Sequence, residues 1–447
     1  MGFERLGRAT GTVRATHRVI RERFGSRRSR RSGLVGLPEP QANAERLARI
    51  LERNILPFWY PGAIDVEHGG YLLHHDQRGN WLGHVPKGIV SQARTLWFFS
   101  RLAERSPNPE RYLGAAQTGF EFVRDRLWDG THGGFFWEVE SDGSAPLKAD
   151  KHMYGQAFGL YALCAFAQAS GSAQAQALAT ELVGLLESHA RDAAFGGYRE
   201  FLRRDWSTPS DPVPDYRNNS DPSRKTQDTH LHLLEAYTAY CRLTGDALAK
   251  RRLTELVLIL ASTVQRQHAG VATDVHDAGW RPLPVPAHEQ VVYGHELEKI
   301  WLLTQASAVV DLAPALLVGC YRSWFSVAHD RAYDRRRGGF FSRGCIGQPA
   351  HVRDKLWWVQ AEGLLAALQM FVHTGDAHYY AIFCHTLDWI EVQQADWTHG
   401  DWHRAIAPSG AVRGNKADAW KTPYHNGRAM IECLVLLGGG TELATDR

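Results

Sequence analysis

Two stretches of the sequence place histidines where they could transfer protons. In GHELE, His295 and Glu298 lie three residues apart, so a helix would present both side chains on one face. Such a carboxylate can hold the tautomer of the imidazole and make it more basic, although an ordinary surface pair has the same spacing. In TPYHNGR, His425 comes two residues after Pro423, a helix breaker that stands directly ahead of a helix-forming run. His425 could therefore act as an acid or base at a helix start, or simply cap that helix.

Polar residues also open other helix-like runs. If these starts converge on one mouth, their positive helix ends suit an anionic intermediate. His230 and His232 have an H-x-H spacing that suggests a metal site, but side chains two residues apart on a helix point about 200° away from each other. We therefore expect no metal site, with His232 facing inward and His230 packing. The runs are QAR at 92–94, THLH at 229–232, GHELE at 294–298, VQAE at 359–362 and YHNGR at 424–428.

A Gly-Gly-aromatic pattern repeats along the chain and divides it into units. Two degenerate copies, around Gly270 and Gly400, complete a series of six units of about 65 residues. The Gly-Gly turns permit positive φ and close backbone approach. The four clear copies are GGY at 69–71, GGF at 133–135, GGY at 196–198 and GGF at 338–340.

Each unit contains two runs with helical periodicity, such as 154–171 and 175–192, followed by the glycines and a short extended piece. The first run of a unit often ends in glycine, which is a common helix stop. Six units of two helices predict an all-α (α/α)6 barrel of six helical hairpins, with short β-like loops at one mouth. The inner ring of such a barrel leaves a cavity at its axis.

Charge and composition exclude several classes of function. Residues 1–31 hold ten Arg against two Glu, so the rest of the chain carries a net charge of −5 out of a total of +3. This balance argues against a nucleic-acid-binding domain. We interpret residues 1–40 as a basic, disordered extension or an artefact of an upstream start codon, because no apolar segment of a signal peptide follows RRSRRSG at 27–33. Residues 41–447 would form one catalytic barrel.

The cysteines and the hydropathy pattern suggest a cytoplasmic protein. No stretch approaches the 18 or so consecutive apolar residues of a membrane span. The six cysteines lie far apart without a C-x-x-C motif, which is typical of reduced, mostly buried thiols. We expect a monomer or homodimer that binds neither nucleic acid nor a membrane. The cysteines are Cys164, Cys241, Cys320, Cys345, Cys384 and Cys433.

Five motifs together resemble the N-acylglucosamine 2-epimerase superfamily, and within it the cellobiose 2-epimerases. They occur in the family's order and span about residues 85–436. The resemblance implies an (α/α)6 barrel, a small carbohydrate substrate, and no metal or redox cofactor. The motifs are KGIVSQARTLWFFS, KTQDTHLHLLEAYTAYCRLTGD, YGHELEKIWLL, WWVQAEGLLAAL and WKTPYHNGRAMIE.

The resemblance also implies roles for individual residues. His295 would be an acid/base at C2 of the sugar, assisted by Glu298. His425 would act in ring opening and as the acid/base on the opposite face. Arg94 would bind the sugar and stabilise an enediolate, because its charged fork donates several hydrogen bonds. The remaining expected contacts to the sugar come from Asp228, His232, Trp358, Glu362 and Trp420, whereas Trp357 is expected to pack in the core.

The substrate stays open between members of the superfamily. Cellobiose 2-epimerases usually have Asn where this chain has Asp228, and an ionised Asp cannot donate a hydrogen bond. The preferred hypothesis is a 2-epimerase that interconverts gluco and manno forms at the reducing end of a β-1,4-linked disaccharide. The alternatives are a D-mannose isomerase, an N-acylglucosamine 2-epimerase, a glycoside hydrolase or lyase on the same barrel, and a non-enzymatic binding module. Hydrolysis is disfavoured because the motif residues are mostly His rather than paired carboxylates.

Overall fold

The computed structural model describes residues 36–211, 221–266, 270–272, 274–283 and 290–438. Within these ranges the chain is predominantly helical, and its strands are only two or three residues long. This confirms the all-α prediction. The predicted basic tail falls mostly on residues 1–35, which lie outside the described residues. Among the described helices, none combines the length and apolar character needed to cross a membrane.

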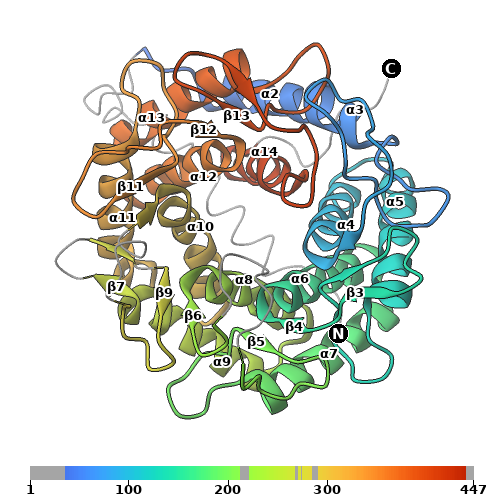
Figure 1. Ribbon diagram of the computed structural model, residues 1–447. Coiled ribbons are helices and arrows are strands. Elements are labelled where there is room, and N and C mark those ends of the chain that lie inside the picture. Colours follow the sequence, from blue (N-terminus) through green and yellow to red (C-terminus); the bar gives the residue numbers. More distant parts are fainter. Residues whose placement is uncertain (1–35, 212–220, 267–269, 273, 284–289, 439–447) are drawn as a thin grey trace.

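Six helices form the inner ring of a barrel, as Figure 1 shows in a view down the barrel axis. Nearly all residues of α6 and α12 are buried, because neighbours in the ring and the outer helices cover them on every side. Four of the six end at a glycine in the left-handed conformation. The inner helices are α4 (Ile89–Ala103), α6 (Met153–Ser170), α8 (Gln227–Thr244), α10 (Tyr293–Val309), α12 (Trp357–Thr374) and α14 (Tyr424–Leu437).

The outer ring consists of helices whose last turn often widens. Five π-helical turns continue these helices, and one 3₁₀ turn (η7, Pro314–Leu316) precedes α11. The outer helices are α2 (Pro40–Ile50), α3 (Leu56–Trp59), α5 (Pro109–Phe122), α7 (Ala173–Leu185), α9 (Ala247–Leu258), α11 (Val318–Ala332) and α13 (Ala377–Trp389). The π turns are η2 (Leu51–Ile55), η3 (Val123–Leu127), η4 (Leu186–Ala190), η5 (Ile259–Thr263) and η8 (Ile390–Gln394).

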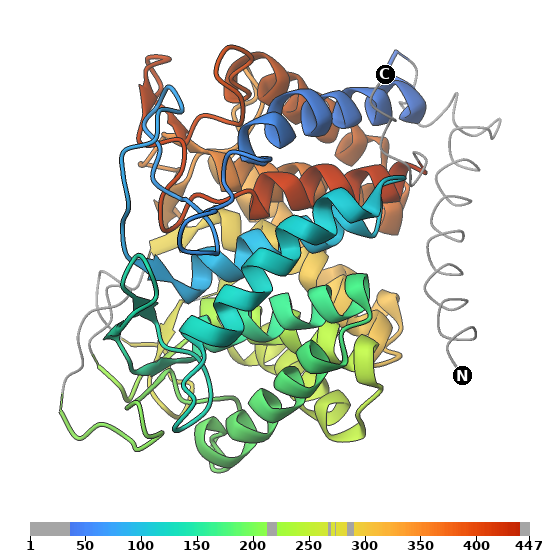
Figure 2. The same cartoon turned by 90° about the vertical axis from the view of Figure 1, so that its right-hand side faces the viewer.

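The two ends of the chain close the barrel. The last inner helix, α14, packs against the first outer helix, α2, so the sixth pair joins segments almost 400 residues apart. Figure 2 shows these two helices running side by side. The prediction of six units is confirmed, but this pair is not a hairpin, since its helices come from opposite ends of the sequence.

Short antiparallel strands gather at one mouth of the barrel, as predicted, and Figure 2 shows them at one end of the helices. In five units a strand leads directly into the inner helix and pairs with a strand that follows the next outer helix; these pairs are β1–β2, β4–β5, β6–β9, β10–β11 and β12–β13. The pairing fixes where each inner helix begins. The strands are β1 (Lys87–Gly88), β2 (Glu138–Val139), β3 (Pro146–Lys148), β4 (Lys151–His152), β5 (Phe201–Leu202), β6 (Lys225–Thr226), β7 (Gln265–Arg266), β8 (Val271–Ala272), β9 (Val275–His276), β10 (Gln290–Val292), β11 (Arg343–Cys345), β12 (Lys355–Leu356), β13 (Ala405–Ile406) and β14 (Val412–Arg413).

The Gly-Gly turns are clamped from the inner helices. Gln360 accepts a hydrogen bond from the backbone N–H of Phe340 and donates one to its carbonyl, both at 2.8 Å. Gly339 has a φ of +75°, and a Cβ there would lie 2.5 Å from Oε1 of Gln360. Gln92 and Gln156 hold Tyr71 and Phe135 in the same way. The second glycine is therefore needed both for its backbone conformation and for the close approach of the glutamine.

An ion pair with a buried lysine ties each of five turns to the segment ahead of an inner helix. The carboxylate accepts backbone hydrogen bonds inside the turn. In four pairs the lysine begins the short strand that leads into the helix, whereas Lys416 lies in the loop before α14. These pairs hold the mouth loops against the helix starts that carry the polar motifs. They are Asp65–Lys87 at 2.6 Å, Asp129–Lys151 at 3.0 Å, Asp192–Lys225 at 2.7 Å, Asp334–Lys355 at 2.9 Å and Asp396–Lys416 at 2.5 Å.

Candidate active site

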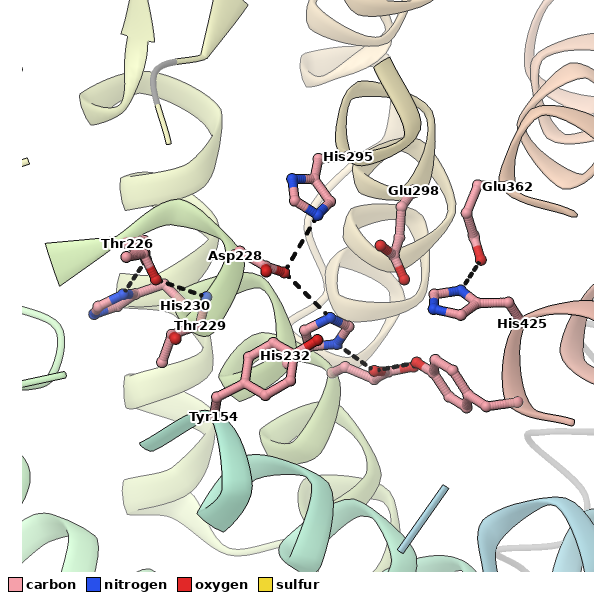
Figure 3. Close-up of polar contacts among 12 residues, drawn as sticks. Tyr154, Thr226, Asp228, Thr229, His230, His232, His295, Glu298, Glu362 and His425 are labelled. Atoms are coloured by element: carbon pink, nitrogen blue, oxygen red, sulfur yellow. Dashed lines mark hydrogen bonds and ion pairs between the residues drawn. The ribbon is translucent and has the colours of Figure 1, made fainter. Parts of the chain in front are cut away.

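The expected site residues converge at the mouth of the barrel from five inner helices and one loop. Figure 3 shows side chains of α8, α10, α12 and α14 directed toward a common space. The helical positions all lie in the first two turns of their helices, as the polar runs predicted. The residues are Arg94 on α4, Asp228 and His232 on α8, His295 and Glu298 on α10, Trp358 and Glu362 on α12, His425 on α14, and Trp420 in the loop before α14.

His425 is held by a carboxylate from the neighbouring helix. Its Nδ1 lies 2.7 Å from Oε1 of Glu362, and both side chains are buried. Burial, together with the positive charges of Arg94 and Arg428, lowers the pKa of His425 well below its ordinary value. Burial raises the pKa of Glu362 to about 8, and the nearby carboxylate of Glu298 adds to this shift. A neutral His425 can accept a proton at neutral pH, as a base requires.

Trp358 contacts both of the histidines that the sequence analysis selected. Its ring centroid lies 5.2 Å from that of His295 and 5.6 Å from that of His425. Gly294 permits this placement, because a Cβ at that position would lie 2.2 Å from the indole. The glycine of the GHELE motif is thus explained by packing. Trp358 is partly exposed and can contact a ligand, whereas Trp357 is buried, as expected.

Asp228 bridges two histidines on different helices. Its Oδ1 lies 3.6 Å from Nε2 of His295 and 3.4 Å from Nε2 of His232. On the other side of the His232 ring, Nδ1 lies 3.1 Å from Oε2 of Glu235. Although burial opposes the charged form, the hydrogen bonds to Asp228 and Glu235 raise the pKa of His232 to about 9. His232 is therefore an imidazolium at neutral pH, with a carboxylate on each side.

Glu298 has a different partner from the one that its spacing suggested. The sequence predicted that Glu298 holds the imidazole of His295, but its Oε1 accepts a hydrogen bond from Nη2 of Arg428 at 2.6 Å. The ion-pair contact of His295 is made with Asp228 instead. The three-residue spacing does place Glu298 in the site. One of its carboxylate oxygens lies within 4.8 Å of a ring nitrogen of His425 and of a carboxyl oxygen of Glu362.

The structure adds three buried residues that the sequence analysis did not select. Arg428 donates to Glu235 through Nη1 at 2.7 Å, and the hydroxyl of Tyr424 donates to the Glu235 carboxylate at 2.6 and 2.7 Å. Glu235 follows His232 by three residues, and Arg428 follows His425 by three. The spacing rule that selected Glu298 would have found both of these positions.

Arg94 lies at the site with its charge over aromatic rings. Its guanidinium stacks 4.2 Å from the ring centre of Phe158, and Nη2 donates to the hydroxyl of Tyr154 at 2.9 Å. Nη1 is 3.4 Å from the carbonyl oxygen of Trp420, so Arg94 also positions the loop that carries this indole. Trp420 is partly exposed, and its ring lies 6.4 Å from that of Trp137.

His230 packs away from the site, as predicted. Its Nε2 accepts a hydrogen bond from the backbone N–H of Tyr198, and Nδ1 lies 2.8 Å from the carbonyl oxygen of Thr226. It therefore takes the place of the clamping glutamine in its unit. Burial lowers the pKa of His230 to about 3, so the ring is neutral.

Two described groups of side chains bring metal-binding atoms within 4.8 Å of one another. The first is Glu298, Glu362 and His425, and the second is Asp65, His68 and His84. In the first group, the guanidinium of Arg428 contacts both carboxylates. In the second, the ammonium of Lys87 lies 2.6 Å from Asp65. Each group thus already holds a side-chain cation against its carboxylates.

Comparisons with known proteins identify related sequences and structures. The family model described as "N-acylglucosamine 2-epimerase (GlcNAc 2-epimerase)" matches residues 70–429. A cellobiose 2-epimerase of Bacteroides fragilis is 30% identical over 87% of this chain and 98% of its own length. A D-mannose isomerase of Marinomonas mediterranea is 26% identical over 86% of this chain and 95% of its own. The solved structure of a cellobiose 2-epimerase from Spirochaeta thermophila has a TM-score of 0.81 at 32% identity, and covers 91% of this chain and 99% of the other.

The fold and the relatives together define a carbohydrate epimerase, an enzyme of the isomerase class. The chain belongs to the N-acylglucosamine 2-epimerase family, in the part of it that contains the cellobiose 2-epimerases. The resemblance found in the five motifs is thereby confirmed, and the family model extends over residues 70–429.

Proposed function

We propose that this enzyme interconverts the gluco and manno forms of the reducing-end residue in a β-1,4-linked disaccharide such as cellobiose. The observation that carries the proposal is the placement of His295 and His425 against the same indole of Trp358, on two different helices and each beside an acidic side chain. Two bases that approach a sugar carbon from different directions can remove and return a proton on opposite faces, as epimerisation requires.

The reaction begins with ring opening, because C2 is acidic only beside the open-chain aldehyde. His425, held neutral beside Glu362, takes the proton of the anomeric hydroxyl and becomes an imidazolium, while solvent supplies a proton to the ring oxygen. His295 removes the C2 proton, and the electrons move onto the aldehyde oxygen to give a cis-enediolate. The His425 imidazolium then returns its proton to C2 on the opposite face, His295 releases its proton to solvent, and the ring closes as the 2-epimer.

Positive charge stabilises the enediolate during this reaction. The guanidinium of Arg94 on α4 can donate to the developing oxyanion, while the imidazolium of His232 on α8, whose two nitrogens face Asp228 and Glu235, contributes through its positive charge. The inner helices add the positive ends of their dipoles at the same mouth. The partly exposed faces of Trp358 and Trp420 provide stacking surfaces, which supports a substrate of more than one sugar ring.

Product analysis of the purified enzyme tests this function. Cellobiose, mannobiose and mannose are incubated separately with enzyme and EDTA, and the products are identified by proton NMR. The proposal predicts that cellobiose is converted to its 2-epimer, with a glucosyl-mannose signal at equilibrium. Fructose formed from mannose, with the disaccharides untouched, would identify an aldose–ketose isomerase like the Marinomonas relative. Free glucose released from cellobiose would contradict the epimerase assignment.

A further inference from the structure

Arg428 lies at the centre of the buried charges of the site. Its side chain is fully buried and contacts three carboxylates that come from three different helices. Nη1 donates to Glu235 of α8 at 2.7 Å, while Nη2 donates to Glu298 of α10 at 2.6 Å and to Glu362 of α12 at 2.7 Å. The hydroxyl of Tyr424 completes the contacts of the guanidinium. One rigid fork therefore connects four of the six inner helices, counting its own helix α14.

The shared nitrogen has a geometric consequence. Because Nη2 contacts both Glu298 and Glu362, the carboxylate that supports His425 is fixed relative to the helix that carries His295. Lysine could not reproduce this arrangement, since one ammonium lacks the planar fork that reaches Glu235 at the same time. The fork thus sets the relative position of the two histidines through their supporting elements.

The guanidinium also has an electrostatic consequence for His425. Removing it would leave several carboxylates near the imidazole without a cation, and a protonated His425 would then be favoured. The charged and titratable groups around His425 are Arg94 from α4, His232 from α8, His295 and Glu298 from α10, Glu362 from α12, and Tyr424 and Arg428 from α14.

We infer that Arg428 is a positioning residue for proton transfer: its single guanidinium fixes Glu298 and Glu362 at a common point and keeps His425 in the uncharged, proton-accepting form. This inference rests on the proposed function, and it assigns Arg428 a part in that function beyond folding. It separates two contributions, the shape of the fork and its charge, which different substitutions remove.

Two variants separate these contributions. Arg428→Lys keeps the charge and removes the fork, so kcat should fall by about 10- to 100-fold while the acid limb of the pH profile of kcat/KM stays in place. Arg428→Met removes the charge, so the acid limb should move to higher pH by about one unit or more. The acid limb reports the groups that must be unprotonated in the free enzyme, which are His295 and His425, so the pKa of His425 is also followed directly by imidazole ¹⁵N NMR. An Arg428→Met enzyme in which neither the acid limb nor the pKa of His425 moves upward would overturn the inference.

A matched control comes from another arginine that pairs with carboxylates between inner helices, and it is half-buried. Arg101 of α4 contacts Glu104 and donates to Glu432 of α14 at 2.9 Å, two turns beyond Arg94 and away from the mouth. Arg101→Lys should lower thermal stability without moving the pH profile. If it moves the acid limb as far as Arg428→Met does, the effect belongs to general loosening of the barrel and the inference fails.

A fallback variant and a second readout keep the test decisive. If Arg428→Met does not fold, the double variant Arg428→Met/Glu235→Gln removes one positive and one negative charge and should show a smaller upward shift, because Glu298 and Glu362 still lack their cation. If the wild-type enzyme converts none of the sugars, the proposed function fails, and the inference is then tested by imidazole ¹⁵N NMR, with the His425 signal assigned by its loss in His425→Gln. An unchanged pKa of His425 without the guanidinium would overturn it.

Discussion

The Nδ1 atom of His425 lies 2.7 Å from Oε1 of Glu362, and the same carboxylate oxygen accepts a hydrogen bond from Arg428. This relationship fixes the orientation of the ring and directs Nε2 away from the carboxylate. The proton affinity of the histidine therefore depends on a side chain 63 residues earlier in the chain.

Replacing Glu362 tests that relationship. Glu362→Gln keeps the shape but removes a carboxyl group that can exchange a proton with His425, so kcat should fall by about 10²-fold or more. The variant should still fold, because the pKa of Glu362 is raised to about 8 and the amide resembles the neutral carboxyl. As pH rises from about 4.5 to 8, Glu362 ionises in the unfolded chain but stays protonated in the fold, so the free energy of unfolding decreases. Thermal unfolding should therefore show the wild type losing stability relative to Glu362→Gln over that window, and equal losses would contradict the assignment.

Asp228 is predicted to hold the charge of His232. In Asp228→Asn the pKa of His232 should fall below about 9, because a carboxylate that raises it is lost. Imidazole ¹⁵N NMR measures this value, with the signal assigned by its absence in His232→Gln. In the wild type, the raised pKa stabilises the fold below about pH 6.5, and this contribution is lost as pH rises through 9. A pKa unchanged by the substitution would show that Glu235 alone sets the charge.

His230 should be replaceable by the residue found at equivalent positions. In another unit, Gln360 bonds both backbone groups of Phe340 and also donates to the carbonyl of Leu356 at 3.1 Å. His230→Gln should therefore keep activity and melting temperature within a few degrees, whereas His230→Ala should lose stability. Between wild type and His230→Gln, the wild type should lose more stability in acid. The pKa of His230 is about 3 in the fold, so the free energy of unfolding falls as pH drops below about 6.5 and the unfolded chain takes up a proton.

The clamped glycines should not tolerate a side chain. Gly339→Ala places a Cβ against Gln360 at a φ of +75° and should cost more than about 2 kcal/mol. Gly184 provides the matched control, since it lies in α7 with nothing within 4 Å of an added Cβ. Gly184→Ala should stabilise the protein by about 0.5–1 kcal/mol. Chemical denaturation of both variants checks the pair, and similar free energies of unfolding would contradict the clamp.

The barrel could be predicted from the sequence because its signals are local and repeated. The spacing of the glycines gave the number of units, and helical periodicity placed helices such as α6 and α12 to within two residues. The pairing of α14 with α2 could not be derived in this way, because it joins opposite ends of the chain. No periodic pattern within a unit records that contact.

The site was predictable only where local spacing or the family motifs pointed to it. The i, i+3 rule selected Glu298, but the hydrogen bond to Arg428 crosses 130 residues and altered the expected pairing with His295. The Tyr424–Glu235 contact spans 189 residues. Such contacts depend on how the inner helices face one another, and that geometry is set by the closed ring rather than by any segment alone.

The central claim is that His295 and His425 exchange the C2 proton through an enediolate. The most direct test is proton NMR of cellobiose conversion in D₂O with EDTA present, followed over the first turnovers. The account predicts that the 2-epimer carries deuterium at C2 from its first appearance, and that Glu362→Gln slows this incorporation together with product formation. A 2-epimer that retains protium at C2, or deuterium incorporation unaffected by removing both histidines, would contradict the account.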